Sequence, residues 1–138
     1  MAISATSYVE GSGVAKTVRE LLDDARACES TDVVAARMMA QQARVLARSL
    51  DDGAGEAESL YRLASIAYTD GQPDDAFAIA LDTRDLARKV HATVVEVWAL
   101  NLVGLVHYNA GKYFAAWAEK ASLDNEQNAI VMRSDEGR

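Results

Sequence analysis

The hydrophobic pattern of this chain predicts a series of amphipathic helices. Between residues 13 and 132, apolar side chains return every three or four positions, as they do on one face of a helix. No segment alternates with period two over enough residues to indicate a strand. Alanine, leucine and arginine recur, while proline occurs once, at Pro73. The sequence therefore predicts an all-α protein.

Turn residues divide the pattern into six predicted helices with short connections. The segment 51–55 (Asp-Asp-Gly-Ala-Gly), Gly71 and Gly111 are each expected to end a helix, because glycine adopts the positive φ of a helix C-terminus at low cost. Ser12 is a suitable N-cap for the first helix, and Pro73 suits the first turn of the fourth. The predicted helices span about residues 13–28, 32–50, 56–70, 73–90, 93–110 and 112–132. Consecutive helices should be antiparallel neighbours.

Each predicted helix has one apolar stripe that should face the core. From first to last, the stripes are Val14, Val18, Leu21, Leu22 and Ala25; Ala36, Ala40, Ala43, Leu46 or Ala47, and Leu50; Leu60, Leu63, Ala64 and Ala67; Ala76, Ala80, Thr83, Leu86, Ala87 and Val90; Leu100, Val103, Gly104 and His107; and Ala116, Lys120 and Leu123. On this pattern His107 is a core residue and not a base or a metal ligand.

A period of 40 residues links three segments of the chain. The central segment contains Leu60, Tyr68, Gly71 and Ala76, and the same residue types recur as Leu100, Tyr108, Gly111 and Ala116. Counting back by the same step, Ala76, Ala80, Arg84 and Leu86 correspond to Ala36, Ala40, Arg44 and Leu46. A fixed period of this length is the signature of a helical repeat array.

The spacing within the repeats resembles that of the tetratricopeptide repeat (TPR) family. That family has an apolar residue, a leucine and a small residue three and four positions later, a glycine turn, and alanines in the second helix. The matching residues are Leu60, Leu63, Ala64, Gly71, Ala76 and Ala80, then Leu100, Val103, Gly104, Gly111 and Ala116. The period of 40 residues exceeds the usual TPR length of about 34. Long repeats of this kind look like those of regulatory regions in bacterial signalling proteins, such as TPR-containing diguanylate cyclases and transcription regulators.

The resemblance implies a right-handed α-solenoid of three TPR-like helix pairs, six antiparallel helices in all. The pairs would cover about residues 13–50, 56–90 and 93–132, within a single domain of residues 13–132. Residues 1–12 are small and polar and are predicted to form a flexible lead-in, and residues 133–138 a frayed end.

Composition narrows the classes of partner. The formal net charge of −7 argues against binding to nucleic acid or to an anionic membrane surface. No stretch approaches the roughly 18 uncharged residues of a membrane span. The single cysteine, Cys28, has no partner for an internal disulfide and gives no sign of an oxidising compartment. The sequence thus predicts a soluble, cytoplasmic protein.

The sequence contains no recognisable set of catalytic, cofactor-binding or metal-binding residues. Residues 10–17 approach the phosphate-binding loop pattern, but Glu10 and Ala15 stand where that loop needs glycine. A capped helix start explains this segment better. Neither histidine has a Cys, Asp or Glu at the helical spacing of a metal pair. The chain is therefore predicted not to be an enzyme and to need no cofactor.

In TPR arrays the first helix of each pair lines a concave face. On that resemblance, the face would bind a protein or peptide through Arg19, Tyr61, Ser65, Tyr68, Trp98, Asn101 and Tyr108. Exposed tyrosine and tryptophan suit such a surface, because they bury a large area with little loss of entropy. The alternative is that these aromatic residues pack between neighbouring repeats.

The last predicted helix carries Phe114 and Trp117 beside its core stripe, with nothing after it to cover them. An uncovered aromatic patch indicates an interface. The sequence predicts either self-association as a homodimer through this helix or a further segment that covers it. Two functions follow: an interaction scaffold that binds a protein or peptide, or the regulatory region of a larger bacterial signalling protein.

Overall fold

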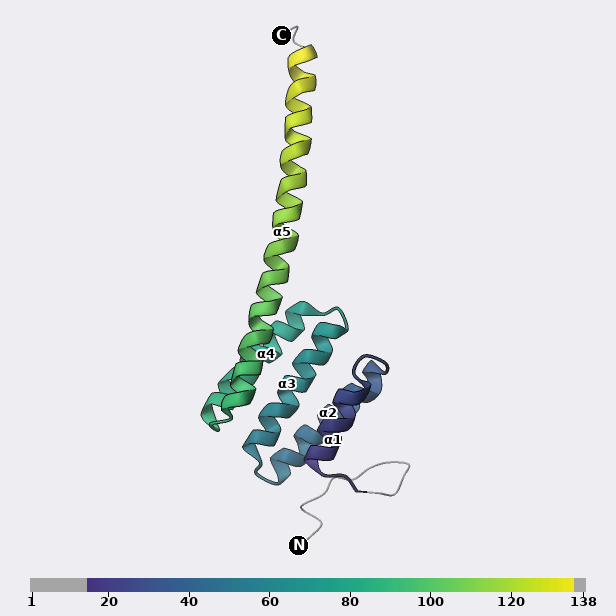
Figure 1. The fold of residues 1–138 in the computed structure, drawn as a ribbon, viewed down its shortest axis with the longest axis vertical. Helices are drawn as coiled ribbons and strands as arrows, with labels where there is room; N and C mark the ends of the chain where they lie inside the picture. Colours follow the sequence, from purple (N-terminus) through teal and green to yellow (C-terminus); the bar gives the residue numbers. More distant parts are fainter. Residues whose placement is uncertain (1–14, 136–138) are drawn as a thin grey trace. The chain divides into compact units, whose positions relative to one another are not determined.

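The computed structural model describes the backbone of residues 15–135 and, within that range, the side chains other than those of residues 113 and 124–135. It contains five helices: α1 (Val18–Cys28), α2 (Val33–Ser49), α3 (Gly53–Thr69), α4 (Pro73–Lys89) and α5 (Thr93–Asp135) (Figure 1). The described range holds no β-strand, and the predicted all-α class is confirmed. Ser12, Val14 and the lead-in of residues 1–12 lie outside the described residues.

The predicted count of six helices is wrong, because α5 continues through Gly111. The segments predicted as the fifth and sixth helices form one helix from Thr93 to Asp135. The difference from the earlier turn lies in the residues that follow the glycine. Gly71, with φ of 77°, is followed by Gln72 and Pro73, and proline starts a new helix. No proline follows Gly111, and a glycine inside a helix costs only about 1 kcal/mol relative to alanine.

The chain divides into two units, residues 1–104 and residues 105–138, which are treated separately. In the first unit, α2 packs against both α1 and α3, and α4 packs against α3. The helices α1 and α3 also touch each other directly. Successive helices in this unit are thus neighbours in space, as the short connections predict.

Small residues dominate the core of the first unit. Most of the predicted stripe residues of the first four helices are buried: Val18, Leu21, Leu22, Ala25, Ala36, Ala40, Ala43, Leu46, Ala47, Leu60, Ala64, Ala67, Ala76, Ala80, Thr83 and Ala87. One cluster joins α1 to α2 through Leu21, Leu22 and Leu46. A second brings Ile66 of α3 against Ala25, Ala36 and Ala40. The alanines allow the helices to approach closely, because interaxial distance depends on the side chains at the contact.

The predicted core stripe of α5 is wrong. The buried residues in this helix are Val95, Ala99, Leu102 and Val106, whereas Leu100, Gly104 and His107 are exposed. The 40-residue period identified the face of α5 that corresponds to the α4-facing side of α3. Within the described side chains, no helix covers that face of α5. In the first unit, Val95 of α5 packs back onto the preceding helices, against Ala57 and Ala87.

Side-chain caps mark the starts of α1, α2 and α3. Thr17, not Ser12, caps α1: its hydroxyl accepts from the Glu20 amide, and Glu20 accepts from the Thr17 amide. Asp32 and Asp52 cap α2 and α3 by accepting from the amides of Ala35 and Gly55. The third helix therefore starts at Gly53, three residues earlier than predicted.

Three turns between helices each contain one residue with positive φ. These are Asp51 (54°), Gly71 (77°) and His91 (61°). In the segment 51–55 a glycine was expected to take the positive φ, but Asp51 adopts it, and aspartate tolerates this conformation better than most residues.

We expect His91→Gly to stabilise the protein by about 0.5–1 kcal/mol. His91 is exposed and sits at φ of 61°, where a Cβ atom is strained and glycine is not. Gly71→Ala should destabilise the protein, since φ at that position is 77°. Urea unfolding of both variants measures the two changes, and a destabilised His91→Gly would contradict this explanation.

Candidate protein-binding face

Polar side chains connect α1 to α3 across one face of the first unit. The Arg19 guanidinium donates to both oxygens of Glu58, one of them at 3.1 Å, and to Asp23 at 3.1 Å. The hydrogen bond with Glu58 raises the pKa of Arg19 above its usual value. Arg19, predicted to be a groove residue, is therefore held by this chain's own carboxylates.

A second connection centres on Glu29, at the end of α1. Its carboxylate accepts from Arg62 at 2.9 Å, from Ser65 at 2.5 Å and from Thr69 at 3.4 Å, all on α3. The side chains of Glu29 and Arg62 are each 12% exposed. Ser65, predicted to contact a ligand, is thus occupied with Glu29. This cluster could not be predicted from the sequence, because Glu29 and Arg62 are not related by a helical spacing.

Tyr61 and Trp98 bring α3 and the start of α5 together. Their ring centroids lie 5.4 Å apart with the planes at 46°, and the Arg62 guanidinium carbon lies 5.5 Å from the Tyr61 centroid. The predicted alternative, packing between neighbouring repeats, therefore holds in part for these two rings. Trp98 nevertheless remains 36% exposed, so the pair packs together and still offers a surface.

A hollow of about 240 Å³ opens beside this aromatic pair. It is lined by Arg26, Tyr61, Arg62 and Trp98, from α1, α3 and α5. Arg62 is engaged by Glu29, whereas no ion pair is recorded for Arg26 with any residue whose side chain is described. We refer to these four residues as the Arg–aromatic face. It contains two guanidinium groups, two aromatic rings and no carboxylate.

The other predicted groove residues lie apart from this hollow. Tyr68 is half-buried near the end of α3, and Asn101 is exposed on α5. Tyr108 is exposed in the second unit, and its place relative to the first is not described. Of the seven predicted residues, the structure brings Tyr61 and Trp98 together at one hollow.

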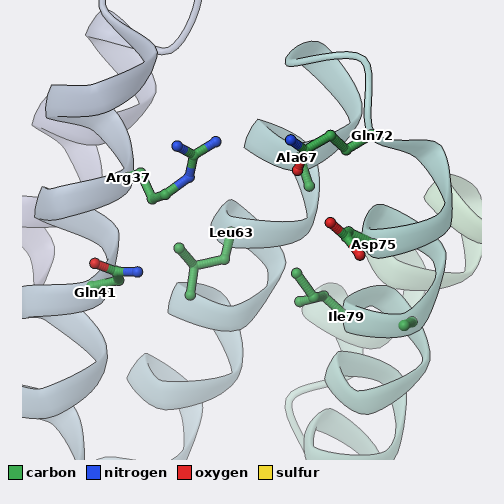
Figure 2. Close-up of a pocket in the computed structure, with 8 residues that line it drawn as sticks. Arg37, Gln41, Leu63, Ala67, Gln72, Asp75 and Ile79 are labelled. Atoms are coloured by element: carbon green, nitrogen blue, oxygen red, sulfur yellow. The ribbon is translucent and has the colours of Figure 1, made fainter.

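A second hollow, of about 300 Å³, lies between α2, α3 and α4. Its lining includes Arg37 and Gln41 from α2, Leu63 from α3, and Asp75 and Ile79 from α4 (Figure 2). The Arg37 guanidinium, drawn above Leu63, pairs with Asp70 at 3.0 Å. The sequence did not predict this hollow, because its polar residues sit outside the stripes that reveal the core.

In the second unit, Phe114 and Trp117 form an exposed aromatic pair. The two side chains are 66% and 65% exposed, and their ring centroids lie 5.8 Å apart. Residues three positions apart lie on the same side of a helix, so the rings form one patch. This patch is available for the predicted self-association, which stays a prediction.

The titratable groups of the described residues form no metal site. No group of three or more His, Cys, Asp or Glu side chains that could hold a metal ion occurs among them. Within the same range, no helix is both long enough and apolar enough to cross a membrane.

Cys28 is expected to react slowly with alkylating agents. Burial raises the pKa of its thiol, and the nearby Asp32 adds to the effect. Because the thiolate is the reactive form, its fraction at pH 8 should be smaller than in an unstructured cysteine peptide. Iodoacetamide labelling should therefore be slower in the native protein than after unfolding at the same pH, and should speed up as the pH rises. Equal native and unfolded rates would contradict this expectation.

Comparison with known proteins assigns no family. No family model matches the chain, and neither does any solved structure. A segment of 33 residues is 48% identical to the phosphatidylserine decarboxylase proenzymes of Rickettsia typhi and Rickettsia prowazekii. The match covers 24% of this chain and 14% of each decarboxylase. A similarity confined to so small a share of those enzymes does not carry their activity to this chain.

Proposed function

We propose that this chain is a non-enzymatic helical-repeat scaffold of the TPR type, which binds a protein or peptide on its Arg–aromatic face. The observation that carries the proposal is the hollow of about 240 Å³ beside the Tyr61–Trp98 pair. Aromatic residues and arginine are the side chains most enriched at the energetic centres of protein interfaces. A helical face that presents both, and whose Arg26 forms no ion pair with the described side chains, suits recognition of a peptide.

The charges on this face favour an acidic ligand segment. Glu58 and Asp23 are engaged by Arg19, and Glu29 by Arg62, so the carboxylates near the face are already paired. Arg26 is exposed at the hollow and can form a bidentate pair with a ligand carboxylate. The rings of Tyr61 and Trp98 can cover a neighbouring apolar side chain of the ligand. The proposed ligand is therefore an extended peptide with an apolar or aromatic residue next to Asp or Glu.

Selection from a random peptide library on the purified protein tests this proposal. The Tyr61→Ala/Trp98→Ala double variant is kept out of the selection and serves only to measure the binding of the enriched peptides. Enriched peptides should combine an acidic with an apolar residue. Their affinity should fall about 30-fold for Trp98→Ala, as at an interface hot spot worth roughly 2 kcal/mol.

Two control variants separate the face from general surface effects. Arg26→Ala should weaken binding, whereas Lys89→Ala removes an exposed positive charge from α4 and should leave it unchanged. Val34→Ala trims an exposed apolar side chain on α2 and should also have no effect. Selected peptides that bind all of these variants equally would contradict the proposal.

The second candidate is the regulatory region of a larger signalling protein that senses a small ligand. The observation that favours it is the hollow between α2, α3 and α4 (Figure 2). Its volume of about 300 Å³ is at the lower limit of small-molecule sites. A small-molecule library screened by thermal shift tests it: hits should be lost with Leu63→Trp, which fills the hollow, and kept with Trp98→Ala.

A further inference from the structure

The hollow between α2, α3 and α4 carries charged groups of opposite sign on two of its walls. Arg37 of α2 and Asp75 of α4 both line it, and Figure 2 shows Leu63 of α3 between them. All three residues belong to the first unit, and the volume they enclose with their neighbours is about 300 Å³. The hollow therefore offers a cation, an anion and an apolar surface to one small molecule.

Arg37 keeps most of its hydrogen-bonding capacity for a ligand. Its guanidinium has five N–H groups, and one of them donates to the Asp70 carboxylate at 3.0 Å. No other hydrogen bond joins the Arg37 side chain to a described residue. Because the side chain is only 36% exposed, most of it is packed and the guanidinium is held at the hollow. The remaining N–H groups can donate to both oxygens of a carboxylate.

Asp75 is the anionic side of the hollow. It is the third residue of α4, a position from which an acidic side chain can accept from the N-cap amide. Here the N-cap amide, that of Gln72, donates instead to the Ala67 carbonyl at 2.9 Å. Among the described residues, no side chain forms an ion pair or a hydrogen bond with the Asp75 carboxylate. This carboxylate can therefore accept from an ammonium group.

The rest of the lining suits a short apolar group. Leu63 and Ile79 are half-buried and contribute aliphatic side chains from α3 and α4, and Ala67 lies beside them. A phosphate or a sugar would need several further hydrogen-bond donors, which these side chains cannot supply. An aliphatic group gains from such a surface, since its contact area is removed from water.

The pair of charges is not a requirement of helix packing in this chain. Forty residues after Arg37 stands Phe77, and forty residues after Asp75 stands Ala115. The apolar position of Leu63 recurs as Val103. The repeat thus keeps the apolar part of the lining, whereas the guanidinium and the carboxylate do not recur.

We propose that this hollow binds a free α-amino acid with an apolar side chain. Arg37 binds the carboxylate, Asp75 accepts from the ammonium group, and Leu63 and Ile79 contact the side chain. The proposal rests on the second candidate function, in which the hollow takes a small ligand, and adds the chemical class of that ligand. Recognition of both charged groups distinguishes a free amino acid from either end of a long peptide, which carries one of the two.

Calorimetric titration of the full chain with L-leucine and two blocked forms tests the proposal. Leucinamide keeps the ammonium group without the carboxylate, and N-acetyl-leucine keeps the carboxylate without the ammonium group. Leucine should bind with a dissociation constant of about 1 mM or lower, within the efficiency range of so small a ligand. Each blocked form should bind at least about 10-fold more weakly, because it loses hydrogen bonds between charged groups.

Two variants assign each charged group of the ligand to its residue. Arg37→Gln should make leucine and leucinamide bind equally, and Asp75→Asn should make leucine and N-acetyl-leucine bind equally. Equal weakening of all three ligands would mean that these residues act only through the fold, and would overturn the assignment. Two matched controls should leave every affinity unchanged: Arg48→Gln, which breaks another ion pair on α2, and Asp74→Asn, beside Asp75 but outside the lining. Circular dichroism checks that all four variants keep their helices.

Failure of this proposal can be told from failure of the second candidate function. No saturable binding of leucine, or equal binding of leucine and either blocked form to the wild-type protein, would overturn the amino-acid proposal. Thermal-shift hits of another chemistry that were lost with Leu63→Trp would then still support the hollow as a small-molecule site. If the library gave no such hit either, both proposals would be overturned.

Discussion

Ile66→Ala should lower the free energy of unfolding by about 3–4 kcal/mol, the range for deleting a large aliphatic side chain from a core that cannot collapse. Ile66 is fully buried on α3 and contacts Ala25 of α1 together with Ala36 and Ala40 of α2. The fully buried neighbours are alanines, which cannot reach into the space, whereas Val33, Met39 and Leu63 pack against the cluster and are only partly buried. The cavity would separate the first helix pair from the rest of the unit.

Urea unfolding followed by circular dichroism measures this effect. Ile66→Val, which removes a single methylene, should cost about 0.5–1.5 kcal/mol. Val45→Ala is the matched surface control, because Val45 is an exposed aliphatic residue on α2, and should change stability by less than about 0.5 kcal/mol. A loss below about 1 kcal/mol for Ile66→Ala would contradict the tight packing of α3 on α1 and α2.

Glu29→Ala should cost about 2–4 kcal/mol, at the lower end of the range for breaking a buried ion pair because some solvent reaches the site. The Glu29 carboxylate accepts from Arg62, Ser65 and Thr69. Its removal leaves the Arg62 guanidinium, 12% exposed, without its counter-charge. The Arg62 Nε atom already lacks a hydrogen-bond partner among the described atoms. No hydrogen bond at that atom therefore offsets the loss of the Glu29 carboxylate.

Two further variants locate the origin of the Glu29 effect. Asp85→Ala breaks the exposed Arg84–Asp85 pair and should cost no more than about 1 kcal/mol. Arg62→Met combined with Glu29→Ala should recover part of the lost stability, since no charge then remains buried. If Glu29→Ala and Asp85→Ala had equal effects on the urea midpoint, the Glu29 cluster would not have the role assigned to it.

The sequence predicted the helices well where period and turn chemistry agree. Pro73 begins α4 as expected, and the alanine stripes of α2 and α4 are buried. The predicted turn at Gly111 is wrong, because a glycine permits a turn but does not require one. The predicted burial of Leu100 and Gly104 is also wrong. A repeat period identifies equivalent positions, but it does not show whether a helix covers them.

The candidate site could be predicted only in part for a similar reason. Tyr61 and Trp98 were identified from their residue type and their place in the repeat. Contacts such as Glu29 with Arg62 join residues 33 positions apart, and no local pattern reports them. The same is true of the hollow lined by Arg37 and Ile79.

Chemical-shift mapping of the isotope-labelled protein, titrated with a selected acidic–apolar peptide, tests the proposed binding face most directly. The largest changes should be in the backbone amides of Arg26, Tyr61 and Arg62 and in the indole N–H of Trp98. Arg37 and Ile79, at the other hollow, should stay unchanged. Shifts confined to the hollow between α2, α3 and α4, with the Trp98 indole unmoved, would contradict binding on the Arg–aromatic face.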